Sequence, residues 1–196
     1  MIRQTLKTWI PIAAASTAVL LGAFSVGQQV MRQSANFVPQ QIAEDAAYQL
    51  ENGAVPASIM PLDRSVVDVS HSVAPFVMVF DEQDKALESS MKMGSTLPTP
   101  PSGVFAYVRN YGEERILTWE PGNGVRLATT IIHWKSSVPA TGGAIASGFV
   151  LGGQGLRQVE DTTQRLFYMM LAGWLATMVG TLVVTFLSIW IFRDRE

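Results

Sequence analysis

Two long apolar runs without charged residues, residues 8–31 and 166–192, bracket the rest of this 196-residue chain. Each run is long enough to cross a bilayer as a helix, because about 20 residues rising about 1.5 Å each span a hydrocarbon core of roughly 30 Å. Neither run contains Asp, Glu, Lys, Arg or His, so we expect no ion path or proton relay in the membrane. The pattern predicts two transmembrane helices with one compact domain, residues 32–165, between them.

Basic residues near the two ends of the chain predict its orientation. Arg3 and Lys7 lie in the short segment 1–7 before the first run, and the tail 193–196 contains two more arginines. Positive charge favours the cytoplasmic side of a membrane. We therefore expect both termini in the cytoplasm of a bacterial cell and the central domain outside its plasma membrane.

The first run also has features of a cleaved signal peptide. A basic start precedes the apolar segment, and Ala23, Phe24 and Ser25 offer a poor small-residue cleavage site. An intact amino terminus on the mature protein would exclude cleavage.

Small residues recur at a spacing of four in both runs, and such stripes permit close approach of helices. We expect the two spans to pack with each other or across a dimer, although alanine and glycine are also common in membrane helices without a specific partner. The stripes are Ala14, Ala18 and Gly22 in the first run, and Ala172, Ala176 and Gly180 in the second.

The composition of residues 32–165 excludes several classes of function. This segment contains ten Lys and Arg against fourteen Asp and Glu, without long runs of one sign. Nucleic acid is not an expected partner, because phosphate binding needs clustered basic residues. Cysteine is absent, so there is neither a disulfide nor a thiol nucleophile, and no nucleophile-elbow serine motif occurs. We predict no enzyme activity and no cofactor.

The start of the central domain is predicted to be a helix that continues the first span. Its apolar residues recur every three or four positions. Pro39 either kinks this helix or makes it restart, with Asn36 near the new cap. Gly53 and Pro56 end it, and residues 54–61 form a loop. The apolar positions are Ala35, Val38, Ile42, Ala46 and Leu50.

The remaining segments predict an α+β fold with five antiparallel strands. A short helix is expected to have Ser102 as its cap and Gly112 as its stop, and residues 65–73 are either an edge strand or a second short segment. The last helix runs from Leu156 into the second span. The predicted strands are 76–80 and 85–90, joined by an acidic turn, and then 114–119, 125–134 and 144–151.

This order of elements resembles the PAS-like Cache domains of bacterial sensor kinases and chemoreceptors. The resemblance covers roughly residues 37–165 and rests on FVMVFDEQDKALESS, PPSGVFAYVRNYGEERILTWEPGNGVRLATTIIHW and SGFVLGGQGLRQVE. It implies that one sheet binds a small molecule on the face covered by the helix and loops, and that the terminal helices pass the change through the membrane.

Such receptors continue into HAMP, kinase or methyl-accepting regions, whereas only four residues follow the second run here. We therefore expect a sensory module that acts through a membrane protein partner or a homodimer. The alternative is a structural or accessory subunit of a membrane complex that binds no small molecule.

Four side chains are predicted to form a ligand pocket between the sheet and its helix: Tyr107, Tyr111, Arg126 and His133. Core tyrosines and a surface arginine are the alternative. Because His71 and His133 are the only imidazoles and no ligand spacing surrounds them, we predict no metal site.

Two further motifs have a structural and a functional interpretation. The glycines Gly152, Gly153 and Gly155 suggest a phosphate-binding turn, but their position at the end of the domain favours a simple turn from strand to helix. The acidic turn with Asp81, Glu82 and Asp84 suggests a cation site, but a solvated hairpin turn usually has the same composition.

Overall fold

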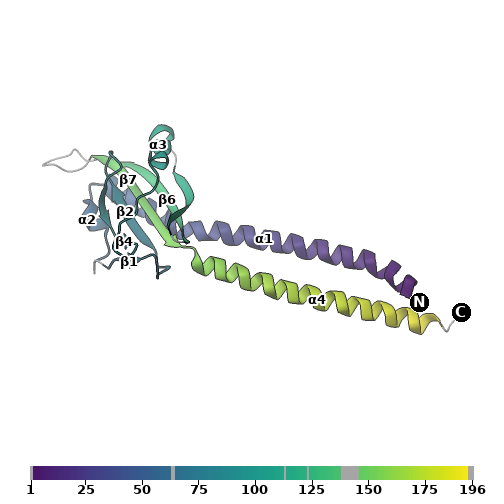
Figure 1. The fold of residues 1–196 in the computed structure, drawn as a ribbon. Helices are drawn as coiled ribbons and strands as arrows, with labels where there is room; N and C mark the ends of the chain where they lie inside the picture. The colour runs from purple at the N-terminus through teal and green to yellow at the C-terminus, as the bar shows by residue number, and fades with distance from the viewer. Residues whose placement is uncertain (1, 63–64, 113, 123, 138–145, 194–196) are drawn as a thin grey trace. The chain divides into compact units, whose positions relative to one another are not determined.

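The computed structural model describes residues 2–62, 65–112, 114–122, 124–137 and 146–193 (Figure 1). The chain divides into two compact units: Met1–Met31 with Glu160–Glu196, and Arg32–Val159. Two long helices, α1 (Ile2–Glu51) and α4 (Arg157–Arg193), contribute residues to both units. Residues 194–196 of the predicted tail and the predicted strand start at 144–145 lie outside the described residues.

Both α1 and α4 contain an apolar stretch long enough to cross a membrane, as the sequence predicted. The helix α1 continues through Pro39 without restarting. Proline lacks an amide hydrogen, so it leaves the carbonyl four residues earlier, that of Ala35, without its helix partner. The side-chain amide of Gln154 donates to this carbonyl at 3.0 Å. A residue of the sheet thus replaces the hydrogen bond that Pro39 removes.

The second unit is built on a five-stranded antiparallel sheet, which confirms the predicted α+β fold class. Its spatial order is β3-β2-β7-β6-β5, so that β7 is central and β3 and β5 are the edges. The strands are β2 (Phe76–Phe80), β3 (Ala86–Ser89), β5 (Arg115–Gly122), β6 (Val125–Lys135) and β7 (Ser147–Gly155).

Smaller elements differ from the predictions. The predicted loop 54–61 contains a short helix, α2 (Pro56–Ile59), and residues 65–73 contribute β1 (Val67–Asp68). This strand pairs in parallel with β4 (Met91–Lys92) in a separate two-stranded sheet, so it is not an edge of the main sheet.

The helix on the other side of the sheet, α3 (Ser102–Tyr111), begins one residue earlier than predicted. Its cap position is Pro101, which offers no side-chain hydrogen bond, so the expected Ser102 cap is wrong. Gly112 ends the helix as expected, because its φ of 65° lies in the left-handed region that favours glycine.

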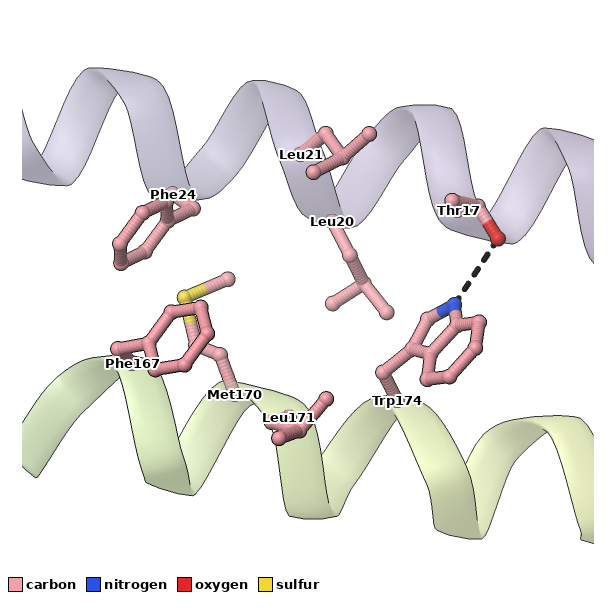
Figure 2. Close-up of a pocket in the computed structure, with 8 residues that line it drawn as sticks. All are labelled: Thr17, Leu20, Leu21, Phe24, Phe167, Met170, Leu171 and Trp174. Carbon is pink, nitrogen blue, oxygen red and sulfur yellow. Dashed lines mark hydrogen bonds between the residues drawn. The ribbon is translucent and has the colours of Figure 1, made fainter.

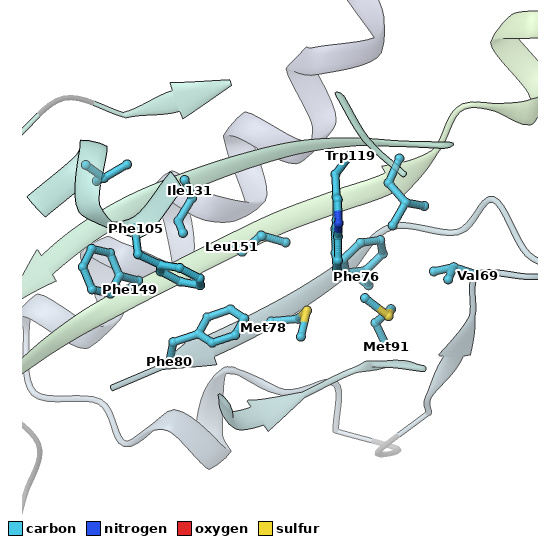
Figure 3. Packing of buried hydrophobic residues seen from close by; sticks show 12 residues of the cluster. Val69, Phe76, Met78, Phe80, Met91, Phe105, Trp119, Ile131, Phe149 and Leu151 are labelled. Carbon is cyan, nitrogen blue, oxygen red and sulfur yellow. The ribbon is translucent and has the colours of Figure 1, made fainter. Parts of the chain in front are cut away.

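Helices cover both faces of the sheet. On the α1 face, Ala46, Ala47 and Leu50 pack against side chains of β2, β6 and β7, including the buried Trp134. On the α3 face, Phe105 and Val108 pack on the opposite side chains of the same strands (Figure 3). Strand alternation explains this division, because successive side chains point to opposite faces.

The glycines near the end of the domain lie inside β7 and form no turn. A Cβ at Gly152 would lie 2.2 Å from the Pro39 carbonyl oxygen of α1, and one at Gly153 would lie 2.3 Å from the Phe76 ring. Both sequence interpretations of these glycines, a phosphate-binding turn and a simple turn, are therefore wrong. Gly152 and Gly153 are needed because helix and ring pack directly on the strand backbone.

Candidate functional site

Four charged or titratable side chains meet where the β2–β3 turn lies against α3 and β6. We call this set, Glu82, Asp84, Arg109 and His133, the Arg109 cluster. The Arg109 guanidinium donates to the Asp84 carboxylate at 2.6 Å and to the Glu82 carbonyl at 2.9 Å. Its Nε lies 3.6 Å from the Glu82 carboxylate. The cluster joins a turn, a helix and an inner strand.

The imidazole of His133 completes the cluster from β6. Its Nε2 lies 2.7 Å from the Glu82 carboxylate. The buried ring of Phe149 forms the floor, with the His133 ring centroid at 4.8 Å and the Arg109 guanidinium at 5.0 Å. The charged groups thus cover the edge of the apolar core, and all four side chains remain about one-third exposed.

The hairpin turn is held in a conformation that presents these carboxylates. The Asp81 carboxylate accepts hydrogen bonds from the backbone amides of Gln83 and Lys85, both at 2.9 Å. Asp84 has a φ of 62°, the left-handed conformation that aspartate tolerates better than most residues. The local sequence therefore fixes the turn before Arg109 and His133 engage it.

The electrostatics of the cluster favour an ionised Glu82. Partial burial pushes the pKa of the Glu82 carboxyl upward, but hydrogen bonds with His133 and Ser147 and electrostatic interactions with His133 and Arg109 outweigh it. The pKa of Glu82 consequently lies below its ordinary value. Because the groups are partly exposed, each ion pair contributes at most about 1 kcal/mol to stability.

The Arg109 cluster acts as a clamp that holds the β2–β3 turn against α3 and β6. Both carboxylates already accept bonds from Arg109 or His133. Within the described part of the chain, no group of three or more His, Asp or Glu side chains is placed to hold a metal ion. The acidic turn is therefore neutralised by side chains of α3 and β6, which neither sequence interpretation of it anticipated.

The structure brings together only some of the predicted pocket residues. The rings of Tyr107 and Tyr111 lie 4.7 Å apart on α3, and the Arg115 guanidinium stacks 4.6 Å from the Tyr107 ring. Arg126 and His133 are seven residues apart on β6, roughly 23 Å at the rise of a strand, and point to opposite faces. The structure therefore does not gather all four at one place.

A cleft of about 220 Å³ lies elsewhere in the sheet domain, between α2 and β3. Its walls include Met60 and Val66, and its polar groups include the Glu88 carboxylate and nearby serines. A mixed lining with one carboxylate suits a small molecule that carries hydroxyl or amino groups.

The first unit is an antiparallel helix pair joined by a regular seam of large side chains. The Trp9 indole donates to Thr181 Oγ1 at 3.0 Å, and the Trp174 indole donates to Thr17 Oγ1 at 2.9 Å. One heptad further along, the rings of Phe24 and Phe167 meet edge to face at 5.9 Å. Contacts every seven or eight residues are typical of coiled-coil packing.

An apolar cleft of about 260 Å³ opens along this seam (Figure 2). Leu20 and Phe24 of α1 face Phe167 and Met170 of α4 across it, and the Thr17–Trp174 hydrogen bond closes one end. In a bilayer such a hydrogen bond between helices contributes about 0.6–2 kcal/mol.

The small-residue stripes lie outside this seam. Ala14, Ala18 and Gly22 are exposed on α1, as are Ala172, Ala176 and Gly180 on α4. A Cβ added at Gly22 or Gly180 would meet no atom within 4 Å. The apolar stretches of α1 and α4 pack with each other, but through bulky Trp, Phe and Thr side chains and not through the stripes.

Sequence reasoning missed Arg109 and the contact between Glu82 and His133. The sequence showed the members of the cluster only as an acidic turn and as isolated basic residues far along the chain. Their meeting depends on how α3 crosses the sheet. The Trp, Thr and Phe residues that recur about every seven positions in the apolar runs could have indicated the seam.

No protein-family model, curated protein or solved structure matches this chain at a significant level.

Proposed function

We propose that this chain is a membrane-anchored sensory subunit whose sheet domain receives a signal and passes it through α1 and α4 to a membrane protein partner. The observation that carries this proposal is the continuity of α1 and α4. The helices attached to the sheet are the same helices that contain the stretches long and apolar enough to span a membrane. A change in the sheet domain can therefore reach the two apolar stretches along α1 and α4 themselves.

The attachment of α1 to the sheet supports this transmission. The α1 backbone contacts Gly152 of the central strand directly, and Gln154 holds the Ala35 carbonyl. Ala43 and Leu50 are fully buried on the sheet. Because close-packed interfaces move as units, a shift of β7 must move this part of α1.

The attachment of α4 is equally short. β7 ends at Gly155 and α4 begins at Arg157. The amide of Leu156 between them donates to the Arg126 carbonyl of β6 at 2.9 Å, and the Arg157 guanidinium donates to the Ser70 carbonyl at 3.0 Å. The central strand thus touches one span-containing helix and leads into the other.

The Arg109 cluster is the contact that we propose changes on signalling. A Cache-like domain takes its ligand on the face covered by the helix and loops, but here Phe80, Phe105 and Phe149 fill that face and are at most 1% exposed. Reception there requires α3 to move relative to the sheet. The partly exposed clamp between α3, the β2–β3 turn and His133 is the contact that resists this movement.

The same filled face favours a second candidate function. A domain that buries large aromatic side chains where a ligand would sit can serve as a rigid docking part of a membrane complex. This accessory subunit would have no small-molecule ligand.

Opening of the clamp tests the sensory proposal. Because the natural chain lacks cysteine, spin labels can be placed at Val26→Cys and Met169→Cys on exposed positions of the helix pair. We expect Arg109→Ala to change the distance distribution between the labels in nanodiscs. The control is Lys85→Ala, which removes an exposed cation from the same hairpin. Identical distributions in all three proteins would refute transmission.

Ligand-dependent stability distinguishes the two candidate functions. The full chain in mild detergent is heated with separate panels of amino acids, short-chain carboxylates and divalent cations. Binding to the folded state at 100 times the Kd adds about 2.7 kcal/mol to stability. A raised Tm with one class, abolished by Glu88→Gln or Arg109→Ala, supports the sensor and locates its site. No shift with any class favours the accessory subunit.

A further inference from the structure

The cleft between α2 and β3 lies along the outer edge of the main sheet, because β3 is an edge strand. β1 covers the continuation of this edge, where it pairs with β4 (Met91–Lys92). The Val67 amide at the start of β1 donates to the Ser90 carbonyl at 2.8 Å. Ser65 and Val66, which precede β1, line the cleft together with Ser90 and residues of β3. The cleft therefore lies where β1 stops covering the edge.

The backbone of β3 presents a carbonyl group on this outer side. The Ser90 amide donates to the Val77 carbonyl of β2 at 2.9 Å. The Ser89 carbonyl belongs to the same trans peptide unit as the Ser90 amide, so it points the opposite way, away from β2. On that outer side it receives no hydrogen bond from another described residue. Ser89 lines the cleft, and its carbonyl is an acceptor available to a ligand there.

Glu88 supplies a negative charge to the same cleft. Its side chain is partly buried, and it forms no hydrogen bond or ion pair with another described residue. The hydroxyls of two neighbouring serines are already engaged with the backbone. Ser90 Oγ accepts from the Val77 amide at 2.9 Å, and Ser89 Oγ donates to the Met91 carbonyl at 2.9 Å. The Glu88 carboxylate and the Ser89 carbonyl are thus two acceptors without a donor.

The other walls of the cleft are apolar. Ala57 lies in α2, Met60 and Pro61 follow this helix, and Val66 is 49% exposed on the opposite side. The volume of about 220 Å³ is smaller than the roughly 300–1,000 Å³ of sites for drug-sized ligands. A molecule with a short aliphatic part and one polar end matches this size and lining.

The charge of the cleft determines which polar end it accepts. The Glu88 carboxylate repels an anion. An ammonium group has three donors and no acceptor, so it can donate to a carboxylate and a carbonyl at the same time. A metal ion is a poorer match, because the described part of the chain places no group of three His, Asp or Glu side chains to hold one.

We propose that this cleft binds a small aliphatic primary amine, whose ammonium group donates to the Glu88 carboxylate and the Ser89 carbonyl. The aliphatic part lies against Met60 and Val66. Met60 also packs against the buried residues between α1 and the sheet, so the ligand contacts a side chain that supports α1. A role of the amine as the signal rests on the proposed sensory function, whereas binding itself does not.

Three ligands with four carbons each test the charge preference: butylamine, 1-butanol and butyrate. Their binding to the full chain in nanodiscs is titrated by saturation-transfer NMR. We expect butylamine to bind at least about tenfold more tightly than the other two, because only its polar end gains charge-assisted hydrogen bonds. Equal binding of butylamine and 1-butanol, or no binding of butylamine at millimolar concentration, would overturn the proposal.

Two variants test the location. Glu88→Gln keeps the size of the side chain and is expected to weaken butylamine binding at least about tenfold. Its matched control is Glu120→Gln, which removes the same charge from an exposed position of β5 at the opposite edge of the sheet and should leave binding unchanged. Nanodiscs with either variant contain the same lipid, so partition of the amine into lipid cancels.

Ala57→Phe fills the cleft from an exposed position of α2 without changing its charge. We expect it to abolish butylamine binding while the Tm of the protein stays close to that of the natural chain. Butylamine binding that survives Glu88→Gln would place the amine elsewhere and overturn the proposal. The label distances that test transmission are measured without any amine, so the two proposals can fail separately.

Discussion

Gly152 is a position at which the fold leaves no room for a side chain. A methyl group there would lie 2.2 Å from the Pro39 carbonyl oxygen and 2.9 Å from the Ala43 amide nitrogen. Both atoms belong to the α1 backbone, so rotation of a flexible side chain cannot relieve the clash. Overpacking of cores costs about 1–3 kcal/mol, and a backbone clash belongs at the upper end. We expect Gly152→Ala to destabilise the protein by about 3 kcal/mol.

Urea unfolding of the full chain in mild detergent, followed by the fluorescence of the buried Trp119 and Trp134, measures this change. The matched control is Gly103→Ala. A methyl group there meets no atom within 4 Å, and Gly103 lies within helix α3. Alanine is favoured over glycine in helices by up to about 1 kcal/mol, so this variant should be stabilised. If Gly152→Ala loses less than about 0.5 kcal/mol, α1 does not pack on β7 as described.

Three further predictions concern single hydrogen bonds. Gln154→Ala should lower the stability of the protein by about 1–2 kcal/mol, because the Ala35 carbonyl that Pro39 leaves without a helix partner also loses the Gln154 side chain. In a Pro39→Ala background the helix supplies an amide to this carbonyl, so Gln154→Ala should then have little effect. Equal losses of stability in both backgrounds of this double-mutant cycle would contradict the prediction. Glu82→Gln should lower stability at neutral pH. The pKa of Glu82 is lowered by folding, so its contribution is present above the ordinary value of 4.5 and is lost as the pH falls through the folded-state pKa. Thermal unfolding from pH 7 to pH 3 should therefore show the two proteins converging, and a constant difference would argue against it. Trp174→Phe should weaken the helix pair by about 0.6–2 kcal/mol through loss of the bond to Thr17, as measured by helix association in bilayers, whereas an unchanged association would mean that this bond does not form in lipid.

Local sequence signals account for most of the fold. The apolar runs, the alternation of 125–134 and the breakers at Gly53 and Gly112 each act within a few residues, and the corresponding helices and strands are confirmed. The error at the β7 glycines arose because its cause is distant in sequence. The sequence around Gly152 and Gly153 predicted a turn, because no neighbouring residue indicates that α1 and Phe76 pack on these two glycines.

The candidate site was predictable only in part, for the same reason. The notable single features, an acidic turn and one of two histidines, are visible in the sequence. The pairing of Glu82 with His133 joins residues 51 positions apart. The small-residue stripes illustrate the opposite case. Their period is a genuine local signal, but composition alone cannot tell which helix face a partner covers, and the seam uses Trp9, Thr17 and Phe24 instead.

Pro39 and Gln154 show how the sheet and α1 depend on each other. A proline in a helix interior costs about 3 kcal/mol or more, partly through the lost hydrogen bond. Here the carbonyl without a helix partner faces the central strand, where Gln154 binds it and Gly152 leaves room for the Pro39 carbonyl. The position that would weaken an isolated helix is therefore the one at which α1 is held to β7. If β7 moves, α1 must either follow or lose this bond, which is the property that a transmitting contact requires.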